Sequence, residues 1–218
     1  MLLIKPYFKI LTPKIVIAGM LGRIEAAGRT CYKSEDRITE DSAKKFVKMI
    51  VARGHETVIE HELMSVRVVC DRGVTHELVR HRIATFSQES TRYCDYSGEL
   101  QFVIPPWLDL PEQCLDKVMI PTPVSGAELV WLHCVGDSER HYRQLRERGW
   151  KPEEARSILP NSLKAEIVMT ANLREWRHFF KLRTASAAHP QMREIARPML
   201  DELKQLIPVI FDDIYYDN

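Results

Sequence analysis

The sequence lacks an excess of charge of either sign. Lysine and arginine together number 31 and aspartate and glutamate 30, which leaves a net charge of +1. Proteins that bind nucleic acid or anionic membranes through bulk electrostatics carry a strong positive charge. The balance argues against both classes, so any site for an anion has to come from a local cluster of donors.

Cysteine is scarce as well. The number is odd, and no two cysteines form a C-x-x-C pair: Cys31, Cys70, Cys94, Cys114 and Cys134. A chain of 218 residues can bury a substantial core without disulfides. Residues 1–21 are apolar, but three lysines and two prolines interrupt them, so neither a signal segment nor a membrane span is expected. We therefore expect a reduced, cytoplasmic protein.

Several common catalytic motifs are missing. No G-x-G-x-x-G turn, P-loop or G-x-S-x-G elbow is present. The stretch HELVRH resembles a zinc-protease motif, but a spacing of five puts His76 and His81 about 140° apart around a helix. The histidines of HETVIEH, six apart, fail in the same way. We expect no metal, and a nucleotide would have to be held by side chains rather than by a glycine-rich turn.

Hydrophobic periodicity predicts one α+β domain over residues 1–218. Alternating and β-branched segments predict strands at 2–11, 61–70 and 100–106. Residues 163–172 fit a strand or a helix, and we favour the strand. Helical spacing predicts helices at 19–32, 38–54, 73–82, 125–148, 152–159, 173–183 and 190–207.

Local signals predict several helix ends. We expect Thr39 to cap one helix and Gly54 to end it, and Ser125 with Glu128 to form a capping box. Near the C-terminus, apolar residues at a 3–4 spacing form one stripe: Met192, Ile195, Met199, Leu203, Leu206 and Ile210. The simplest interpretation is a stripe that faces the core, and an oligomer face is the alternative.

The most unusual segment is RHRIATFSQESTRY, residues 80–93. Its arginines offer planar forks of donors that suit phosphate or a carbonyl edge, and the segment also contains short hydroxyls and the rings of Phe86 and Tyr93. The polar donors include Arg80, Arg82, Arg92, Ser87, Ser90 and Thr91. In a polar turn, backbone amides could join them around a phosphorylated ligand. A solvated charged face is the alternative, and the residues alone leave both open.

This segment resembles the signature of the flavin-dependent thymidylate synthases, R-H-R-x-x-S-x-N-E-x-S-x-R-Y. The matching residues are Arg80, His81, Arg82, Ser90, Arg92 and Tyr93. Thr85 stands for the usual Ser, and Ser87-Gln88 for the usual Asn-Glu, so a neutral amide replaces a carboxylate. Other segments resemble the family in the same order: RGHETVIEHELMSVRV, GWKPEEARSILP, ANLREWRHFFKLR and AHPQMREIA. The resemblance covers about two thirds of the chain.

The resemblance implies reductive methylation of dUMP to dTMP. Methylenetetrahydrofolate would supply the carbon, and FAD reduced by NADPH the hydride, without a protein nucleophile. The family implies a homotetramer whose active sites collect residues from several subunits. It also implies the thymidylate synthase-complementing protein-like fold, with a mostly antiparallel sheet flanked by helices. Neither a nucleic-acid nor a membrane partner is implied.

In the implied flavin site, the family pattern falls on residues from four segments. They are Thr57, Arg80, His81, Arg82, Gln88, Asn172, Leu173, Arg174, His178 and His189. His178 stands where an Asn is expected, and it could still donate a hydrogen bond with a pH-sensitive charge. The arginines would bind the pyrophosphate and favour the anionic reduced ring.

In the implied dUMP site, the pattern falls on Glu77, Leu78, Val79, Arg80, Gln88, Glu89, Ser90, Thr91, Arg92, Arg156 and Arg183. Ser90 and Arg92 are assigned to the phosphate, and Glu77 replaces a more usual Gln. Arg183 is the catalytic residue that the resemblance implies: it would polarise the uracil ring near N3 as C5 becomes nucleophilic. Cys94 has no His or Asp arrangement to activate it, so we interpret it as a bystander.

Two alternatives stay open. A non-catalytic nucleic-acid-binding module would use the same arginines, although the balanced net charge argues against it. A flavin-binding homologue without synthase activity would result if the changes at Glu77, Gln88 and His178 abolished turnover. Bound flavin tests the first alternative, and tritium release from dUMP labelled at C5 tests the second.

Overall fold

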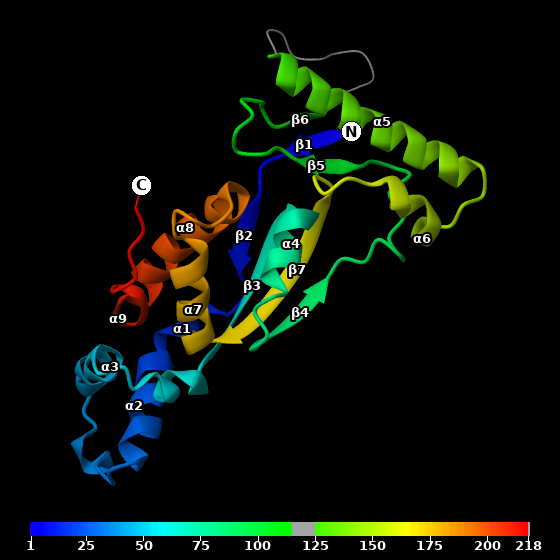
Figure 1. Ribbon diagram of the computed structural model, residues 1–218. Helices are drawn as coiled ribbons and strands as arrows, with labels where there is room; N and C mark the ends of the chain where they lie inside the picture. Colours follow the sequence, from blue (N-terminus) through cyan, green and yellow to red (C-terminus); the bar gives the residue numbers. More distant parts are fainter. Residues whose placement is uncertain (115–124, 218) are drawn as a thin grey trace. The chain divides into compact units, whose positions relative to one another are not determined.

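The computed structural model describes residues 1–114 and 125–217, and it has the predicted α+β composition (Figure 1). The strands are β1 (Leu2–Ile4), β2 (Tyr7–Ile10), β3 (Leu63–Asp71), β4 (Ala84–Gln88), β5 (Gln101–Val103), β6 (Gln113–Cys114) and β7 (Lys164–Asn172). The α-helices are α1 (Lys14–Ala18), α2 (Met20–Thr30), α3 (Ser42–Ala52), α4 (Arg72–Leu78), α5 (Gly126–Glu147), α6 (Pro152–Ala155), α7 (Leu173–Arg183), α8 (Pro190–Leu206) and α9 (Pro208–Phe211). Short 3-10 helices are η1 (Glu35–Arg37), η2 (Glu56–His61) and η3 (Arg156–Ile158).

The chain divides into two compact units. Unit 1 comprises Met1–Tyr7, Val68–Arg80 and Ser87–Ile167, and unit 2 comprises Phe8–Arg67, His81–Phe86 and Val168–Asn218. The single domain over residues 1–218 stays a prediction. Among the described residues, no helix is both long enough and apolar enough to cross a bilayer.

The predicted strand at 2–11 is divided in two. β1 ends at Ile4 and β2 begins at Tyr7, with Pro6 between them. Proline has no N–H to donate to a ladder, which explains the break. β1 lies in a three-stranded sheet of order β5-β1-β6, parallel to β5 and antiparallel to β6. β2 belongs to the larger, antiparallel sheet of order β2-β3-β7-β4.

In unit 1, the long helix α5 packs against the three-stranded sheet (Figure 1). Leu132 and Tyr142 of α5 share a buried cluster with Leu3 of β1 and Phe102 of β5. The predicted capping box is confirmed: the Ser125 hydroxyl accepts from the Glu128 N–H at 3.3 Å, and the Glu128 carboxylate accepts from the Ser125 N–H at 2.6 Å. These two bonds satisfy donors that a helix start leaves open.

In unit 2, the helices enclose an apolar core. In the predicted C-terminal stripe, Met192, Ile195, Met199 and Leu203 are at most 2% exposed, so the core interpretation is confirmed for them. On α7, the Trp176 and Phe180 rings stack, and the Phe180 ring meets the Phe211 ring of α9 edge-on. Helix α7 also packs against α8 and η2, which fixes its orientation within the unit.

One predicted cap is wrong. Helix α3 begins at Ser42 with Asp41 at its N-cap position, so Thr39 lies outside the helix. The Ser42 hydroxyl accepts from the Thr39 N–H at 2.9 Å and donates to the Glu25 carboxylate at 2.7 Å. The other end agrees with prediction: Gly54 follows the helix with φ of 72°, a left-handed conformation that glycine tolerates best.

Two strands run directly into helices and position the residues of interest. β3 continues into α4 at Asp71, whose carboxylate accepts from the Val74 N–H at 2.8 Å. β7 continues into α7 at Asn172, whose side-chain oxygen accepts from the Glu175 N–H, also at 2.8 Å. Both are N-cap bonds, so each helix starts at a defined residue.

The signature segment is only partly the turn that its polarity suggested. Helix α4 ends at Leu78, earlier than the predicted 82, so the Arg-His-Arg triplet at 80–82 lies outside it. Residues 84–88 form the strand β4, which was not predicted. A turn follows, in which the Cys94 N–H donates to the Ser90 carbonyl at 2.9 Å.

Candidate functional site

The predicted site residues separate between the two units. Unit 2 contains most of the predicted flavin residues: Thr57, His81, Arg82, Asn172, Leu173, Arg174, His178 and His189. Unit 1 contains the predicted dUMP residues other than Arg183: Glu77, Leu78, Val79, Arg80, Gln88, Glu89, Ser90, Thr91, Arg92 and Arg156. Arg183 lies in unit 2, and Arg80 and Gln88, which were assigned to both ligands, lie in unit 1.

His81 is the centre of a buried polar cluster in unit 2. The residue is only 4% exposed, and both of its ring nitrogens are bonded. Its Nδ1 lies 2.9 Å from Oε1 of Glu175, and its Nε2 lies 3.1 Å from Nε of Arg183. Because an arginine Nε–H can only donate, Nε2 is the acceptor and Nδ1 carries the proton that is donated to Glu175. The ring is therefore a neutral imidazole of one tautomer.

Helix α7 presents these partners on one face. Glu175, Phe179 and Arg183 follow at steps of four residues, which places them along one side of the helix. The His81 ring packs edge-on against Phe179, with 5.1 Å between ring centroids, and against His178, with 5.8 Å. Hydrogen bonds and ring contacts from α7 thus hold His81 in place.

The pKa of His81 is lowered from its usual value of 6.5. Burial is the largest cause, because it disfavours the charged imidazolium, and the nearby Arg183 and His178 act in the same direction. The hydrogen bond to Glu175 opposes the shift. His81 is consequently neutral at physiological pH, in agreement with its role as an acceptor for Arg183.

The same cluster has the composition of a metal site but not the geometry. Ligand atoms of His81, Glu175 and His178 lie within 4.8 Å of one another. However, Nδ1 of His81 and Oε1 of Glu175 are separated by only 2.9 Å. A tetrahedral ion with bonds of about 2.0–2.2 Å holds its ligand atoms farther apart than that. The distance is that of a direct hydrogen bond.

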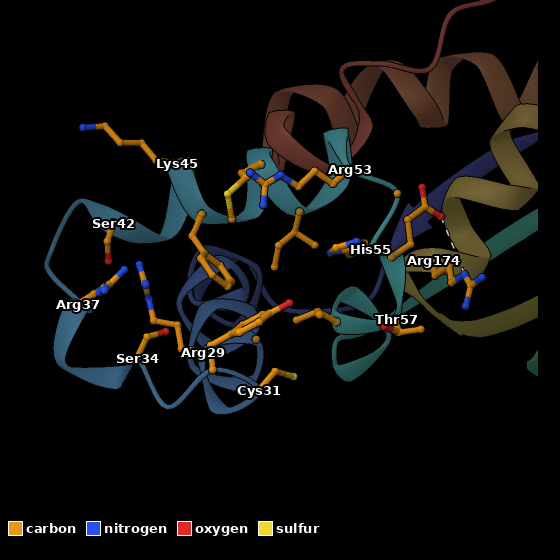
Figure 2. Close-up of a pocket in the computed structure, with 18 residues that line it drawn as sticks. Arg29, Cys31, Ser34, Arg37, Ser42, Lys45, Arg53, His55, Thr57 and Arg174 are labelled. Carbon is orange, nitrogen blue, oxygen red and sulfur yellow. Dashed lines mark ion pairs between the residues drawn. The ribbon is translucent and has the colours of Figure 1, made fainter.

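Two pockets in unit 2 are lined by predicted flavin residues. The larger, of about 970 Å³, lies between α2, α3 and η2 and includes Thr57 and Arg174 (Figure 2). Figure 2 shows Thr57 and Arg174 at one end and Ser34, Arg37 and Ser42 at the other. Its charged lining is mainly basic: Arg29, Arg37, Lys45, Arg53 and Arg174 against Glu56. A pocket with this charge suits a phosphorylated ligand.

The smaller pocket, of about 440 Å³, adjoins the first, because Glu56 and Arg174 line both. It is also lined by the predicted residues Asn172 and His178 and by Glu175. Four predicted flavin residues, from two separate parts of the sequence, therefore line adjoining pockets.

Three of the predicted flavin residues also have structural partners. The Asn172 oxygen caps α7, which leaves its amide nitrogen for a ligand. Leu173 is fully buried and its N–H donates to the Glu62 carbonyl, so its side chain and N–H are occupied. Arg174 forms an exposed ion pair with Glu60 at 2.5 Å, which a ligand phosphate could replace.

In unit 1, the second half of the signature segment surrounds Glu89. Its carboxylate accepts from the Tyr96 hydroxyl and from Lys164, both at 2.9 Å, and from the Glu166 N–H at 3.2 Å. Burial, followed by the nearby Glu89 charge, raises the pKa of Tyr96 far above its usual value. The Glu89 carboxylate thus accepts three hydrogen bonds from the protein, and its charge offsets that of Lys164.

The residues assigned to the phosphate lie in the adjoining turn. Arg92 is 54% exposed at its side chain, with a loose ion pair to Glu153 at 3.7 Å. The Ser90 hydroxyl accepts from the Arg92 N–H at 3.3 Å, and Arg156 donates to the buried Thr91 hydroxyl at 3.1 Å. Arg92 and Arg156 are exposed donors at one turn, a suitable arrangement for an anion.

The remaining dUMP residues lie around α4. Gln88 donates from its amide to the buried Thr75 hydroxyl at 3.0 Å, a contact that a carboxylate could not make as donor. Glu77 and the buried Leu78 end the helix, and Val79 and Arg80 follow it, exposed. Any ligand contact of Leu78 would have to use its backbone.

Sequence reasoning missed Glu175. It lies 94 residues from His81 in the sequence, so no local spacing connects them. One signal was present: Glu175 and Arg183 are eight residues apart on a predicted helix, hence on one face. His189, in contrast, was predicted and is found at the N-cap position of α8, where it is exposed.

Comparison with known proteins agrees with the signature. Residues 17–209 match the family described as thymidylate synthase complementing protein. The flavin-dependent thymidylate synthase of Pyrococcus abyssi is 35% identical over 185 residues, covering 82% of this chain and 70% of that protein. The same enzyme of Pyrococcus horikoshii is 36% identical over 182 residues (80% and 70%), and that of Mycobacterium sp. strain JLS is 33% identical over 204 residues (89% and 80%).

Proposed function

The chain belongs to the family of flavin-dependent thymidylate synthases, and we propose that it catalyses the reductive methylation of dUMP to dTMP. Methylenetetrahydrofolate serves as carbon donor and NADPH as reductant. One observation carries the proposal above all others. Arg183 and His81, each assigned a role by the family resemblance and separated by 102 residues, are hydrogen-bonded at 3.1 Å.

The residues around the two unit 2 pockets fit FAD. Thr57, Asn172, Arg174 and His178 would hold it, and the surplus of basic side chains supplies the pyrophosphate donors that a glycine-rich loop provides elsewhere. FAD, when bound, supplies the hydride. The chain's own contribution is to orient the ring and to keep cationic groups beside it.

For dUMP, the residues divide into binding and activation. Ser90, Arg92 and Arg156 hold the phosphate by charge-assisted hydrogen bonds. Arg183 places a guanidinium at the uracil ring near N3, where it stabilises negative charge that spreads over the ring as C5 becomes nucleophilic. His81 accepts the Arg183 Nε–H, which orients the guanidinium without adding charge.

No protein nucleophile takes part. Cys94 is half-buried, and the family pattern gives its thiol no role in the reaction. The enzyme works as a cytoplasmic homotetramer whose active sites combine residues from several subunits. The location in the cytoplasm and the tetramer with shared sites are proposed from the family resemblance alone.

Tritium release tests the function. Purified protein reconstituted with FAD should release tritium from dUMP labelled at C5 when methylenetetrahydrofolate and NADPH are present, and its flavin absorption should bleach under NADPH. Bound flavin without tritium release would favour the inactive homologue. Protein that takes up no flavin would contradict both flavoprotein assignments.

A further inference from the structure

We propose that Glu175 is a positioning residue that acts on Arg183 through His81. In this arrangement its carboxylate fixes the imidazole tautomer whose Nε2 accepts from the guanidinium. The inference rests on the proposed function, because it assigns the activation of uracil to Arg183. It concerns a residue that the signature segment does not include.

The chain of hydrogen bonds leaves one arrangement of protons. Oε1 of Glu175 lies 2.9 Å from Nδ1 of His81, and Nε of Arg183 lies 3.1 Å from Nε2 on the other side of the ring. With the opposite tautomer, an N–H of His81 would face the Arg183 N–H, while Nδ1 would present a lone pair to a carboxylate. Both contacts would be lost together. The carboxylate therefore determines whether Nε2 of His81 can accept from the Arg183 Nε–H.

Burial makes this arrangement rigid. Glu175 is 7% exposed and His81 is 4% exposed, so water cannot easily replace either partner. The His81 ring is also held by the rings of Phe179 and His178. A guanidinium bonded to a fixed ring has a fixed orientation, and orientation of a catalytic group by about 1 Å can change a rate by about 10²-fold.

A purely structural role for Glu175 is the competing explanation. An acidic residue in the first turn of α7 interacts favourably with the helix dipole, and Glu175 would then stabilise the helix only. The N-cap bond of the helix uses the Glu175 backbone N–H and not its carboxylate. The two explanations differ in what they predict for the proton on His81 and for the pH dependence of turnover.

The first test locates the proton directly. In the FAD-loaded protein labelled with ¹⁵N-histidine, the ring nitrogens of His81 are assigned by comparison with His81→Gln. We expect a protonated Nδ1 and an unprotonated Nε2 at pH 7.5, and a mixture of tautomers in Glu175→Leu. A protonated Nε2 in the wild type, or no change in Glu175→Leu, would overturn the inference. This measurement does not depend on activity.

The second test uses kinetics. Glu175→Leu should lower kcat by about 10–100-fold, with the KM for dUMP within about threefold, because the ligand still binds while Arg183 loses its orientation. Glu175→Gln should recover most of kcat, since its carbonyl can accept from Nδ1. An unchanged kcat in the leucine variant, or a change confined to KM, would contradict the inference.

The pH profile separates positioning from stability. The groups that bear on His81 are Glu175, which raises its pKa, and Arg183 and His178, which lower it. Removing the carboxylate in Glu175→Gln should move the acid limb of the kcat profile to lower pH, although the plateau falls little. A merely structural role would leave the acid limb in place. That result, or a shift of the limb to higher pH, would contradict the inference.

Glu62 offers a matched control. Its side chain is 8% exposed, as is that of Glu175, and it pairs with the Arg23 guanidinium at 2.6 Å in the same unit. Glu62→Gln should lower Tm without moving the acid limb. If both variants shifted the limb alike, the effect would come from general loosening and the inference would fail. Wild-type protein without tritium release would instead overturn the proposed function, and the ¹⁵N measurement would still decide the tautomer.

Discussion

One side chain in each half of the signature segment, His81 in the first and Arg92 in the second, is held in the opposite way to the other. His81, in the first half, is buried and bonded through both ring nitrogens to side chains of α7. Arg92, in the second half, has a side chain that is 54% exposed, and it meets Glu153 at 3.7 Å. His81 is fixed by the fold, and Arg92 keeps a charged donor where a ligand can reach it.

This contrast connects structure with kinetic roles. A buried neutral ring that orients a guanidinium acts on the transition state, so damage to it should appear in kcat. An exposed arginine that holds a phosphate binds ground state and transition state alike, so its loss should appear in KM. The contrast fails if variants of the two halves have the same kinetic signature.

The largest effect is expected for Arg183→Ala. Removing the cation from the uracil ring should lower kcat by about 10²–10³-fold, as for other groups that stabilise developing charge, while FAD stays bound. Tritium release and flavin absorbance measure the two quantities. Arg140→Ala is the control, since that side chain is 57% exposed and pairs with Asp137 on the surface of α5. Retained turnover in Arg183→Ala would mean that the activating group lies elsewhere.

For the second half of the segment, Arg92→Ala should raise the KM for dUMP by about 10–100-fold with little change in kcat, because a charge-assisted bond to the phosphate is lost. Arg92→Lys should recover part of the affinity, since a point charge remains without the planar fork. Steady-state kinetics at varied dUMP decide the matter. A fall in kcat at unchanged KM would remove the distinction between the halves.

Features that depend on neighbours in sequence were predictable. The capping box of α5 follows from Ser125 and Glu128, and the helices at 173–183 and 190–206 follow from their apolar spacing. The start of α3 was not predictable, because the Ser42 hydroxyl that organises it also bonds Glu25 of another helix. Strand β4 depends on its place beside β7 at the end of the sheet order. The polar sequence of residues 84–88 does not indicate that this segment pairs with β7.

The candidate site also has a part that the sequence predicts and a part that only the fold reveals. The signature predicted which side chains matter, since each residue type has a defined chemistry. It could not predict that Thr75 would receive the Gln88 amide, or that Glu175 would hold His81, because these contacts join residues that only the fold brings together. Gln88 also has a definite partner as an amide, which gives the departure from the usual carboxylate a structural reason.

A smaller effect is expected from pH. The folded protein holds the pKa of His81 below 6.5, so between pH 6.5 and that lower value the unfolded chain binds more protons and stability falls as pH falls. Asp95, with a pKa lowered to about 2 by Arg146, loses its contribution only in a more acidic range. His81→Gln should therefore reduce the fall in Tm between pH 7 and pH 5. An identical fall in both proteins would show that His81 is not held neutral.

The smallest effect is expected for Cys94→Ala, which tests whether the second half of the segment serves binding alone. Cys94 is half-buried, and the contact that shapes the turn is its backbone N–H to the Ser90 carbonyl, which alanine keeps. Both kcat and the KM for dUMP should stay within about twofold, because no bond of the thiol enters the proposed reaction. Steady-state kinetics and a thiol-blocking reagent give independent measurements. A loss of kcat as large as that of Arg183→Ala would place a nucleophile beside Arg92 and reverse the division of roles between the two parts of the segment.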